Sequence, residues 1–154
     1  MKSLLRDALE EPFSSALLKV EEALARSHCP CSKLCVSAGW VLSDGSVITG
    51  VNYESASYGL TLCAERSALT RAQVEGEIEK GVGMVLASSW KDTETEAPPL
   101  TPCGACRQWL AELSQRLGRD FPVYSFWKNS DTGIQSTAQE LLPDSFDLKN
   151  LSLD

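Results

Sequence analysis

Apolar positions in the first third of the chain follow two different periods. Around residue 20 they recur every three or four residues between charged side chains, which predicts an amphipathic helix over Ser14–Ser27 that starts near Pro12. A largely apolar run follows and predicts a strand over Leu34–Leu42. Asp44-Gly45 is typical of a hairpin turn, so we expect Val47–Val51 to be the returning strand.

The rest of the chain alternates helical and strand patterns. The predicted elements are a helix at Thr61–Glu75, a strand at Val82–Ser89, a polar loop at Lys91–Pro102, a helix at Cys103–Leu117, a strand at Phe121–Trp127, a short strand at Ile134–Thr137 and a short helix at Ala138–Leu142. This order predicts an α/β fold with a mixed sheet of about five strands and helices on both faces. No repeat or linker interrupts the pattern, so residues 1–154 are expected to form one domain.

Two short cysteine motifs carry the clearest chemical signal. The first is Cys63-Ala64-Glu65, and the second is Pro102-Cys103-Gly104-Ala105-Cys106. A catalytic zinc site uses three protein ligands and leaves a fourth position open, which suits Cys63, Cys103 and Cys106 with Glu65 beside that position to move protons. Both motifs fall at the beginnings of predicted helices, where free amides and the helix dipole stabilise thiolates. The alternative is a buried core cysteine at position 63 and an isolated zinc knuckle.

Charge and cysteine use narrow the function classes. The net charge of −7 and the scattered basic residues disfavour a nucleic acid polymer, and a free small molecule is the expected substrate. Charges at Lys2, Arg6 and Asp7 break up any signal-peptide pattern, and uncharged stretches are too short to cross a membrane. We therefore expect no membrane association and a cytoplasmic location, where cysteine clusters indicate metal binding or catalysis.

Four segments, from about Ser27 to Leu151, resemble the small zinc-dependent cytidine deaminases that act on free nucleosides. They are the two cysteine motifs, extended to Arg66 and to Arg107-Gln108, the segment Gly50–Gly59 and the segment Glu140–Phe146. The resemblance implies a three-layer α-β-α cytidine deaminase-like fold with the two cysteine-bearing helices on one face, one Zn²⁺ per chain and a homotetramer.

The resemblance also assigns residue roles. Asn52 and Glu54 are expected to bind the sugar hydroxyls, and Arg66 to donate hydrogen bonds to the ligand sulfurs. The remaining residues expected to bind substrate, some of them from neighbouring subunits, are Leu34, Ala56, Tyr58, Ala64 and Phe146. Asn52 and Glu54 as solvated turn residues, and Arg66 as a surface arginine, are the alternatives.

The chain departs from the family pattern before its first strand. The family usually has Tyr-Ser-x-Phe-x-Val-Gly-Ala where this chain has Cys31–Ala38, so Cys31 replaces a tyrosine and Leu34 a phenylalanine that packs on the base. The usual Phe-Gly-Pro is Phe146-Asp147-Leu148 here. A wider or differently shaped base pocket is therefore expected.

Three further cysteines, Cys29, Cys31 and Cys35, raise the alternative of a second metal site. Because Cys31 and Cys35 lie in or beside a predicted strand, we interpret the three as small buried hydrophobic residues. His28, the only histidine, is expected at the surface or in an interface.

The leading functional hypothesis is hydrolytic deamination of a cytidine-type nucleoside. Glu65 accepts a proton from zinc-activated water, the hydroxide attacks C4, and Glu65 returns protons to N3 and to the departing ammonia. Three alternatives stay open at this point: the same chemistry on a modified cytidine or a blasticidin-type antibiotic, deamination of a polynucleotide, and a non-catalytic zinc-binding module.

Overall fold

A six-stranded mixed sheet organises the molecule, in the order β1-β6-β5-β4-β2-β3. The computed structural model describes residues 1–147. Neighbouring strands run antiparallel except for β4 and β5, which are parallel because α3 connects them across one face of the sheet. The strands are β1 (Lys2–Leu5), β2 (Leu34–Leu42), β3 (Val47–Val51), β4 (Gly81–Trp90), β5 (Pro122–Trp127) and β6 (Thr132–Thr137).

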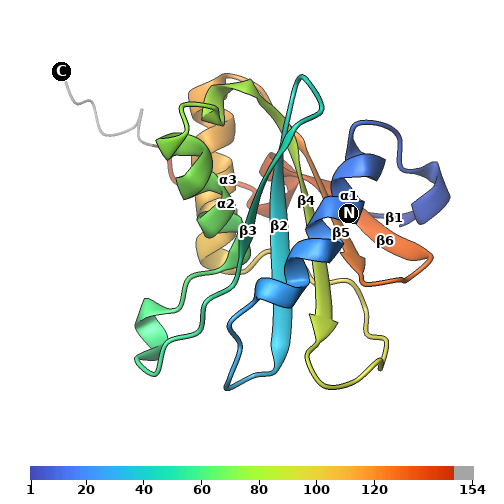
Figure 1. Cartoon of the computed structure of the whole chain (residues 1–154). Helices are drawn as coiled ribbons and strands as arrows, with labels where there is room; N and C mark the ends of the chain where they lie inside the picture. Colours follow the sequence, from blue (N-terminus) through green and yellow to red (C-terminus); the bar gives the residue numbers. More distant parts are fainter. Residues whose placement is uncertain (148–154) are drawn as a thin grey trace.

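Helices cover both faces of this sheet, as the sequence predicts. The α-helices are α1 (Phe13–Ala23), α2 (Ala64–Val74), α3 (Gly104–Leu117) and α4 (Ala138–Leu141), and single 3₁₀ turns lie at Arg6–Ala8, Leu24–Arg26, Tyr58–Leu60 and Ile78–Lys80. In Figure 1, α1 crosses one face, and α2 and α3 lie next to each other on the other side of the sheet. Within residues 1–147, no helix combines the length and apolar character needed to cross a lipid bilayer.

Alternating side chains of β2 and β4 divide the core into two layers. Ala38, Trp40, Met84 and Leu86 face α2 and α3, while Val41, Val85 and Ala87 face α1. The period of two along each strand places successive residues on opposite faces, so one long apolar run serves both layers. Both layers of the core therefore pack against the same two central strands.

Gly50 of β3 allows α2 to lie very close to the sheet. A β-carbon added at this position would come within 2.2 Å of the Ala68 amide nitrogen and 2.7 Å of the Ala64 carbonyl oxygen. Since those are backbone atoms of α2, the helix could not stay where it is above any larger residue. Gly50 thereby fixes the position of the helix that begins directly after Cys63.

Element boundaries differ from the predicted ones in a few places. Strand β1 was not predicted, and it makes the sheet one strand larger than expected by pairing with β6 at the edge. The first helix becomes a 3₁₀ turn after Ala23 and ends at Arg26. The second helix begins at Ala64 because Cys63 has extended backbone angles and is its N-cap.

Candidate active site

The three cysteines of the two motifs meet where α2 and α3 begin. Cys63 is the N-cap of α2, Cys103 is the N-cap of α3, and Cys106 is the third residue of α3. The Cys63 and Cys103 sulfurs are 3.7 Å apart, and those of Cys103 and Cys106 are 3.6 Å apart. All three sulfurs lie within 4.8 Å of one another, so the predicted convergence of the two helix N-termini is confirmed.

This sulfur triangle fits a tetrahedral zinc ion. At a zinc–sulfur bond length of 2.3 Å, tetrahedral angles place two ligand sulfurs about 3.8 Å apart. The two short separations in the structure, 3.6 and 3.7 Å, match that spacing. Within residues 1–147, one group of three metal-binding side chains lies close enough together to share an ion, and it consists of these cysteines. Three thiolates leave a fourth coordination position open.

The environment of the sulfurs favours the thiolate at Cys63. The pKa of Cys63 is lowered to about 5, mainly by the hydrogen bond from the Cys106 thiol. Burial acts in the opposite direction, and Arg66 lowers the pKa further. The pKa of Cys106 is raised, because its thiol bonds to Cys63 and is buried. The Nη2 group of Arg66 lies 3.8 Å from the Cys63 sulfur and also donates to the Thr61 carbonyl at 3.0 Å.

Glu65 is the second residue of α2 and is buried beside the cysteines, with only 5% of its surface exposed. Burial is the main cause that raises the pKa of its carboxyl, and the nearby Cys63 sulfur adds to the effect. A carboxyl group with a raised pKa accepts a proton more readily than an exposed one does. This placement suits a group that carries protons.

A contact that the sequence analysis missed holds the second motif in place. The Arg107 guanidinium donates to the Pro102 carbonyl at 2.7 Å, to the Thr101 hydroxyl at 2.9 Å and to the Leu141 carbonyl at 3.3 Å. It thus ties the turn before Cys103 to the end of α4. Arg107 follows Cys106 directly in the motif, but the distant acceptor at Leu141 leaves no signal in the local sequence.

Comparisons with known proteins identify the family. A model of the cytidine and deoxycytidylate deaminase zinc-binding region matches residues 12–117, which include all three cysteines and Glu65. The chain belongs to the cytidine deaminase family. It is 42% identical over 132 residues to a cytidine deaminase of Halalkalibacterium halodurans, covering 85% of this chain and 91% of the relative.

A further sequence relative and a solved structure support the same family membership. A probable cytidine deaminase of Dictyostelium discoideum is 37% identical over 142 residues, which cover 92% of this chain and 88% of the relative. The crystal structure of a cytidine deaminase from Burkholderia pseudomallei matches with a TM-score of 0.72 and 34% identity, covering 86% of this chain and 98% of that one. The α/β fold and the family resemblance predicted from sequence are confirmed.

The segment that is expected to bind the sugar follows β3. Asn52 is nearly buried, and its side chain accepts from the Val36 amide at 3.0 Å and donates to the Leu34 carbonyl at 2.9 Å. The Glu54 carboxylate accepts from the amides of Cys31 and Ser32, at 2.8 and 3.2 Å, and from the Ser32 hydroxyl. The Ser32 hydroxyl is the main cause that lowers the pKa of Glu54. Both side chains therefore reach the same segment before and within β2.

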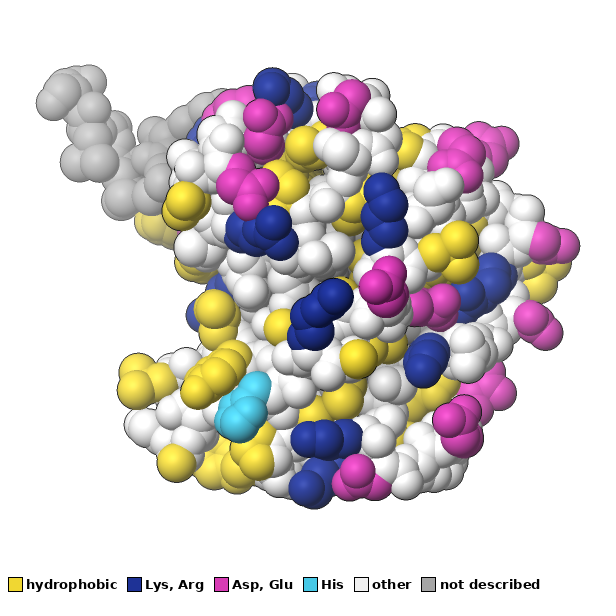
Figure 2. All heavy atoms as spheres, in the orientation of Figure 1, with side chains coloured by type: hydrophobic (Ala, Val, Ile, Leu, Met, Phe, Trp, Pro, Cys, Tyr) yellow, Lys and Arg dark blue, Asp and Glu magenta, His cyan; other side chains and the backbone are white. Residues whose placement is uncertain are grey.

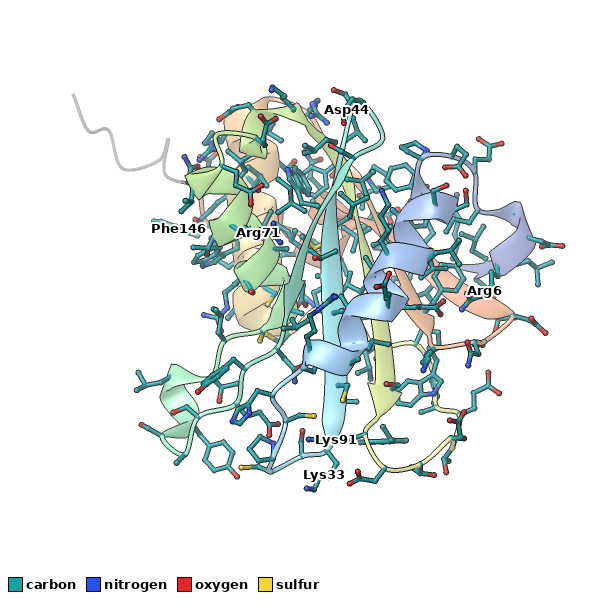
Figure 3. All side chains as sticks on the ribbon, viewed as in Figure 1. Arg6, Lys33, Asp44, Arg71, Lys91 and Phe146 are labelled. Carbon is teal, nitrogen blue, oxygen red and sulfur yellow. The ribbon has the colours of Figure 1, made fainter. Side chains whose placement is uncertain are left out.

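The other expected substrate residues differ in exposure. Ala64 is fully buried at the start of α2, and Leu34 is half-buried at the start of β2. Ala56, Tyr58 and Phe146 are exposed, with 74% of Tyr58 and 55% of Phe146 accessible. Phe146 lies on the side of α2 and α3 in Figure 3, where its carbonyl accepts from Gln108 at 3.4 Å. Figure 2 shows the surface hollowed between this side and the lobe that carries the single histidine.

The three cysteines outside the two motifs differ in solvent exposure. Cys29 and Cys35 are buried, as predicted, but Cys31 is exposed, so the prediction of three buried residues is wrong for Cys31. Cys31 lies in the turn before β2, where its amide bonds to Glu54 and its side chain is left at the surface. His28 is exposed as expected and stacks on Tyr53 with ring centroids 4.6 Å apart.

Proposed function

We propose that this chain is a zinc-dependent hydrolase that deaminates cytidine-type nucleosides to the uridine product and ammonia. The observation that carries the proposal is the joint arrangement of three converging sulfurs and one buried carboxyl group at two helix N-termini. A structural zinc site needs no proton carrier, so Glu65 favours catalysis over the alternative of a non-catalytic zinc module. The names of the relatives support the same substrate class.

Cys63, Cys103 and Cys106 would hold one zinc ion per chain. A zinc ion at this site supplies Lewis acidity, which makes water a nucleophile at neutral pH. Arg66 contacts the Cys63 sulfur and so withdraws part of the negative charge that three thiolates accumulate. The protein's contribution is to keep the ligands fixed and to shield one carboxyl group beside them.

Glu65 moves the protons of the reaction. In the ionised form it accepts one proton of the attacking water and delivers it to N3 of the ring. It then takes the remaining proton from the new C4 hydroxyl group and delivers it to the leaving amine. Burial favours the neutral form of the carboxyl group, so the carboxylate binds the incoming proton firmly enough to hold it between the two steps. One carboxyl group suffices because it accepts the two protons of the water one after the other and passes on each before it takes the next.

Asn52 and Glu54 bind the sugar in this proposal. Each already makes hydrogen bonds to the segment 31–36, which fixes the direction of its side chain. The Asn52 amide still has a second N–H, and the Glu54 carboxylate has further lone pairs, so both can also bond to hydroxyl groups. The segment 31–36 therefore orients the Asn52 amide and the Glu54 carboxylate, and both can still form hydrogen bonds to the sugar.

The base side of the pocket is expected to be altered by Leu34, and Leu34→Phe tests this. Stacking of a base on an aromatic ring is worth about 1–3 kcal/mol, so the added ring should tighten cytidine binding about tenfold. It should also discriminate against cytidines that carry ring substituents. KM and inhibition constants measure both effects.

Leu18→Phe is the matched control for that substitution. Leu18 is 65% exposed on α1, on the other face of the sheet, so the same change there should leave the kinetics unaltered. Unchanged cytidine kinetics and analogue tolerance in Leu34→Phe would show that residue 34 does not line the pocket.

A substrate panel tests the proposed function itself. The zinc-loaded protein should release ammonia from cytidine and deoxycytidine. The half-buried Leu34 in place of a phenylalanine favours a second candidate, the same reaction on a base-modified cytidine or on a blasticidin-type aminopyrimidine nucleoside. Turnover of an analogue at least ten times more efficient than that of cytidine would favour this candidate. The net charge of −7 argues against a polynucleotide substrate.

We further propose that four copies of the chain assemble and complete each other's sites. In the single chain Cys103 is exposed and Cys63 is half-buried, so the metal cluster is open on one side. Large apolar side chains are also exposed in the single chain, including Tyr58, Leu60 and Phe146. A groove of about 560 Å³ between α2 and α3, lined in part by Val74 and Trp109, offers a further apolar contact surface. Closed symmetry is the usual outcome for identical chains.

Mixed oligomers test the sharing of sites between subunits. Chains with Glu65→Ala and chains with Phe146→Ala should each be nearly inactive alone. When they are unfolded and refolded together, some sites combine an intact Glu65 with an intact Phe146, so activity should partly return. Light scattering measures the size of the assembly in the same samples. A fully active monomer would contradict the assembly, and mixing without recovery would contradict the exchange of Phe146.

The domain organisation and the cellular location also belong to this proposal. Residues 1–154 are taken as a single cytidine deaminase-like domain, supported by the one sheet that joins both core layers. A cytoplasmic location is supported by the cysteine chemistry, since cysteine thiols and thiolate zinc ligands persist best in a reducing compartment.

A further inference from the structure

Two buried thiols lie side by side on the α1 face of the sheet, apart from the metal cluster. The sulfurs of Cys29 and Cys35 are 3.2 Å apart, and both residues are free cysteines with at most 6% of their surface exposed. A disulfide bond requires about 2.0 Å between the sulfurs, so they need to approach by only about 1.2 Å. Cys35 occupies a variable position of the family pattern, and neither residue belongs to the zinc motifs.

A cavity gives small molecules access to this pair. It has a volume of about 790 Å³ and is lined by Cys35 together with Ser89, Trp90, Lys91 and Trp127, among others. Cys35 faces Ser89 across the β2–β4 ladder, so its side chain closes one wall of the cavity. Cys29 is fully buried behind it. An oxidant that enters the cavity meets the Cys35 sulfur first.

The chain between the two cysteines is the turn that holds Glu54. Its ends are already close, because the Lys33 amide donates to the Cys29 carbonyl at 3.1 Å and the Lys33 carbonyl accepts from the Lys91 amide at 2.8 Å. Figure 3 shows Lys33 and Lys91 at the same end of the sheet. The amides of Cys31 and Ser32 point from this turn to the Glu54 carboxylate. A bond between Cys29 and Cys35 would fix the turn in the shape that binds Glu54.

We propose that Cys29 and Cys35 form an oxidation site at which a hydroperoxide produces an intramolecular disulfide. The Cys35 sulfur attacks the peroxide, its O–O bond breaks, and Cys35 becomes a sulfenic acid while an alcohol or water leaves. The Cys29 sulfur then attacks the Cys35 sulfur, the S–O bond breaks and water is released. Two thiols and one hydroperoxide thus give one disulfide, one alcohol or water, and one further water.

The surroundings of Cys29 favour its protonated thiol. Burial and the contact with Cys35 raise the pKa of Cys29 to about 11, while Lys91 acts in the opposite direction. The Cys29 thiol therefore stays protonated and unreactive until Cys35 is oxidised beside it. This order suits a site that reacts through its more accessible member.

Peptide mapping of the zinc-loaded protein after treatment with hydrogen peroxide tests the proposal. Trypsin cuts after Lys33 and an endoprotease specific for glutamate cuts after Glu54, so Cys29, Cys35 and Cys63 fall on three separate peptides. We expect the peptide 27–33 linked to the peptide 34–54, with zinc retained. Cys31→Ser is the matched control, since it leaves Cys29 as the single thiol of the first peptide, and the link should persist.

Two further readouts do not depend on catalysis. The oxidised protein should melt about 5 °C higher or more, because the disulfide restricts the unfolded chain, and its Cys31 and Ser32 amides should exchange more slowly. Oxidation confined to Cys31, or a disulfide that forms only as zinc is lost, would overturn the proposal. Any effect on substrate binding rests on the proposed role of Glu54, whereas the mapping stands even if the protein deaminates no cytidine.

Discussion

Glu65→Ala is expected to reduce kcat on cytidine by about 10²–10⁴-fold or more while the protein stays folded and keeps its zinc. The size follows from the usual contribution of a general acid–base group, and in the proposed mechanism one carboxyl group serves every proton transfer of the reaction. Zinc should remain because the proposed ligands are the three cysteines and not Glu65. Steady-state kinetics, metal analysis and circular dichroism measure the three properties on one preparation.

Glu75→Ala is the control for this substitution. Glu75 follows the same helix but is exposed and pairs with Arg71 at the surface, so its loss should leave kcat within about twofold. Near-native turnover by Glu65→Ala would contradict the proposed mechanism. Loss of both zinc and fold would instead assign Glu65 a structural role.

Gly50→Ala is expected to lower the free energy of unfolding by about 3 kcal/mol, as overpacking against a fixed backbone does. The added methyl group would overlap the Ala68 amide and the Ala64 carbonyl, and no side-chain rotation relieves a contact with backbone. If α2 moves away instead, Cys63 moves with it, so zinc affinity should fall as well. Denaturant unfolding and competition with a chelator measure the two effects.

Gly59→Ala provides the matched comparison. No atom lies within 4 Å of the β-carbon position at Gly59, so this variant should unfold within about 0.5 kcal/mol of the parent protein. Equal stability of the Gly50→Ala and Gly59→Ala variants would show that β3 and α2 are not in the close contact described above.

The metal cluster was predictable from sequence because its information is local. Cys63 and Glu65 are two residues apart, Cys103 and Cys106 three apart, and both pairs occur where helical patterns begin. Contacts that join distant segments left no such pattern. The Arg107 bond to Leu141 and the close approach of Gly50 to Ala68 depend on how the elements pack.

In the fold, too, features with a local sequence pattern were predicted and features that depend on distant contacts were missed. The strands with long apolar runs and the helices with clear periodicity were predicted within a few residues, because burial imposes those patterns. Strand β1 was missed because its four residues are mostly exposed and are held by edge pairing with β6, which no local pattern records. Cys31 was expected to be buried like its neighbours, but a turn that presents amides to Glu54 leaves its side chain outside.

The proposed activity depends on one zinc ion held by Cys63, Cys103 and Cys106. The most direct measurement is the rate of uridine formation from cytidine by one preparation before zinc removal, after it and after zinc is restored. We predict uridine and ammonia in equal amounts, loss of the reaction with the metal, and recovery at one zinc per chain. Two results would contradict this proposal. One is a protein that forms no uridine although all three cysteines bind zinc, and the other is unchanged turnover after complete removal of zinc.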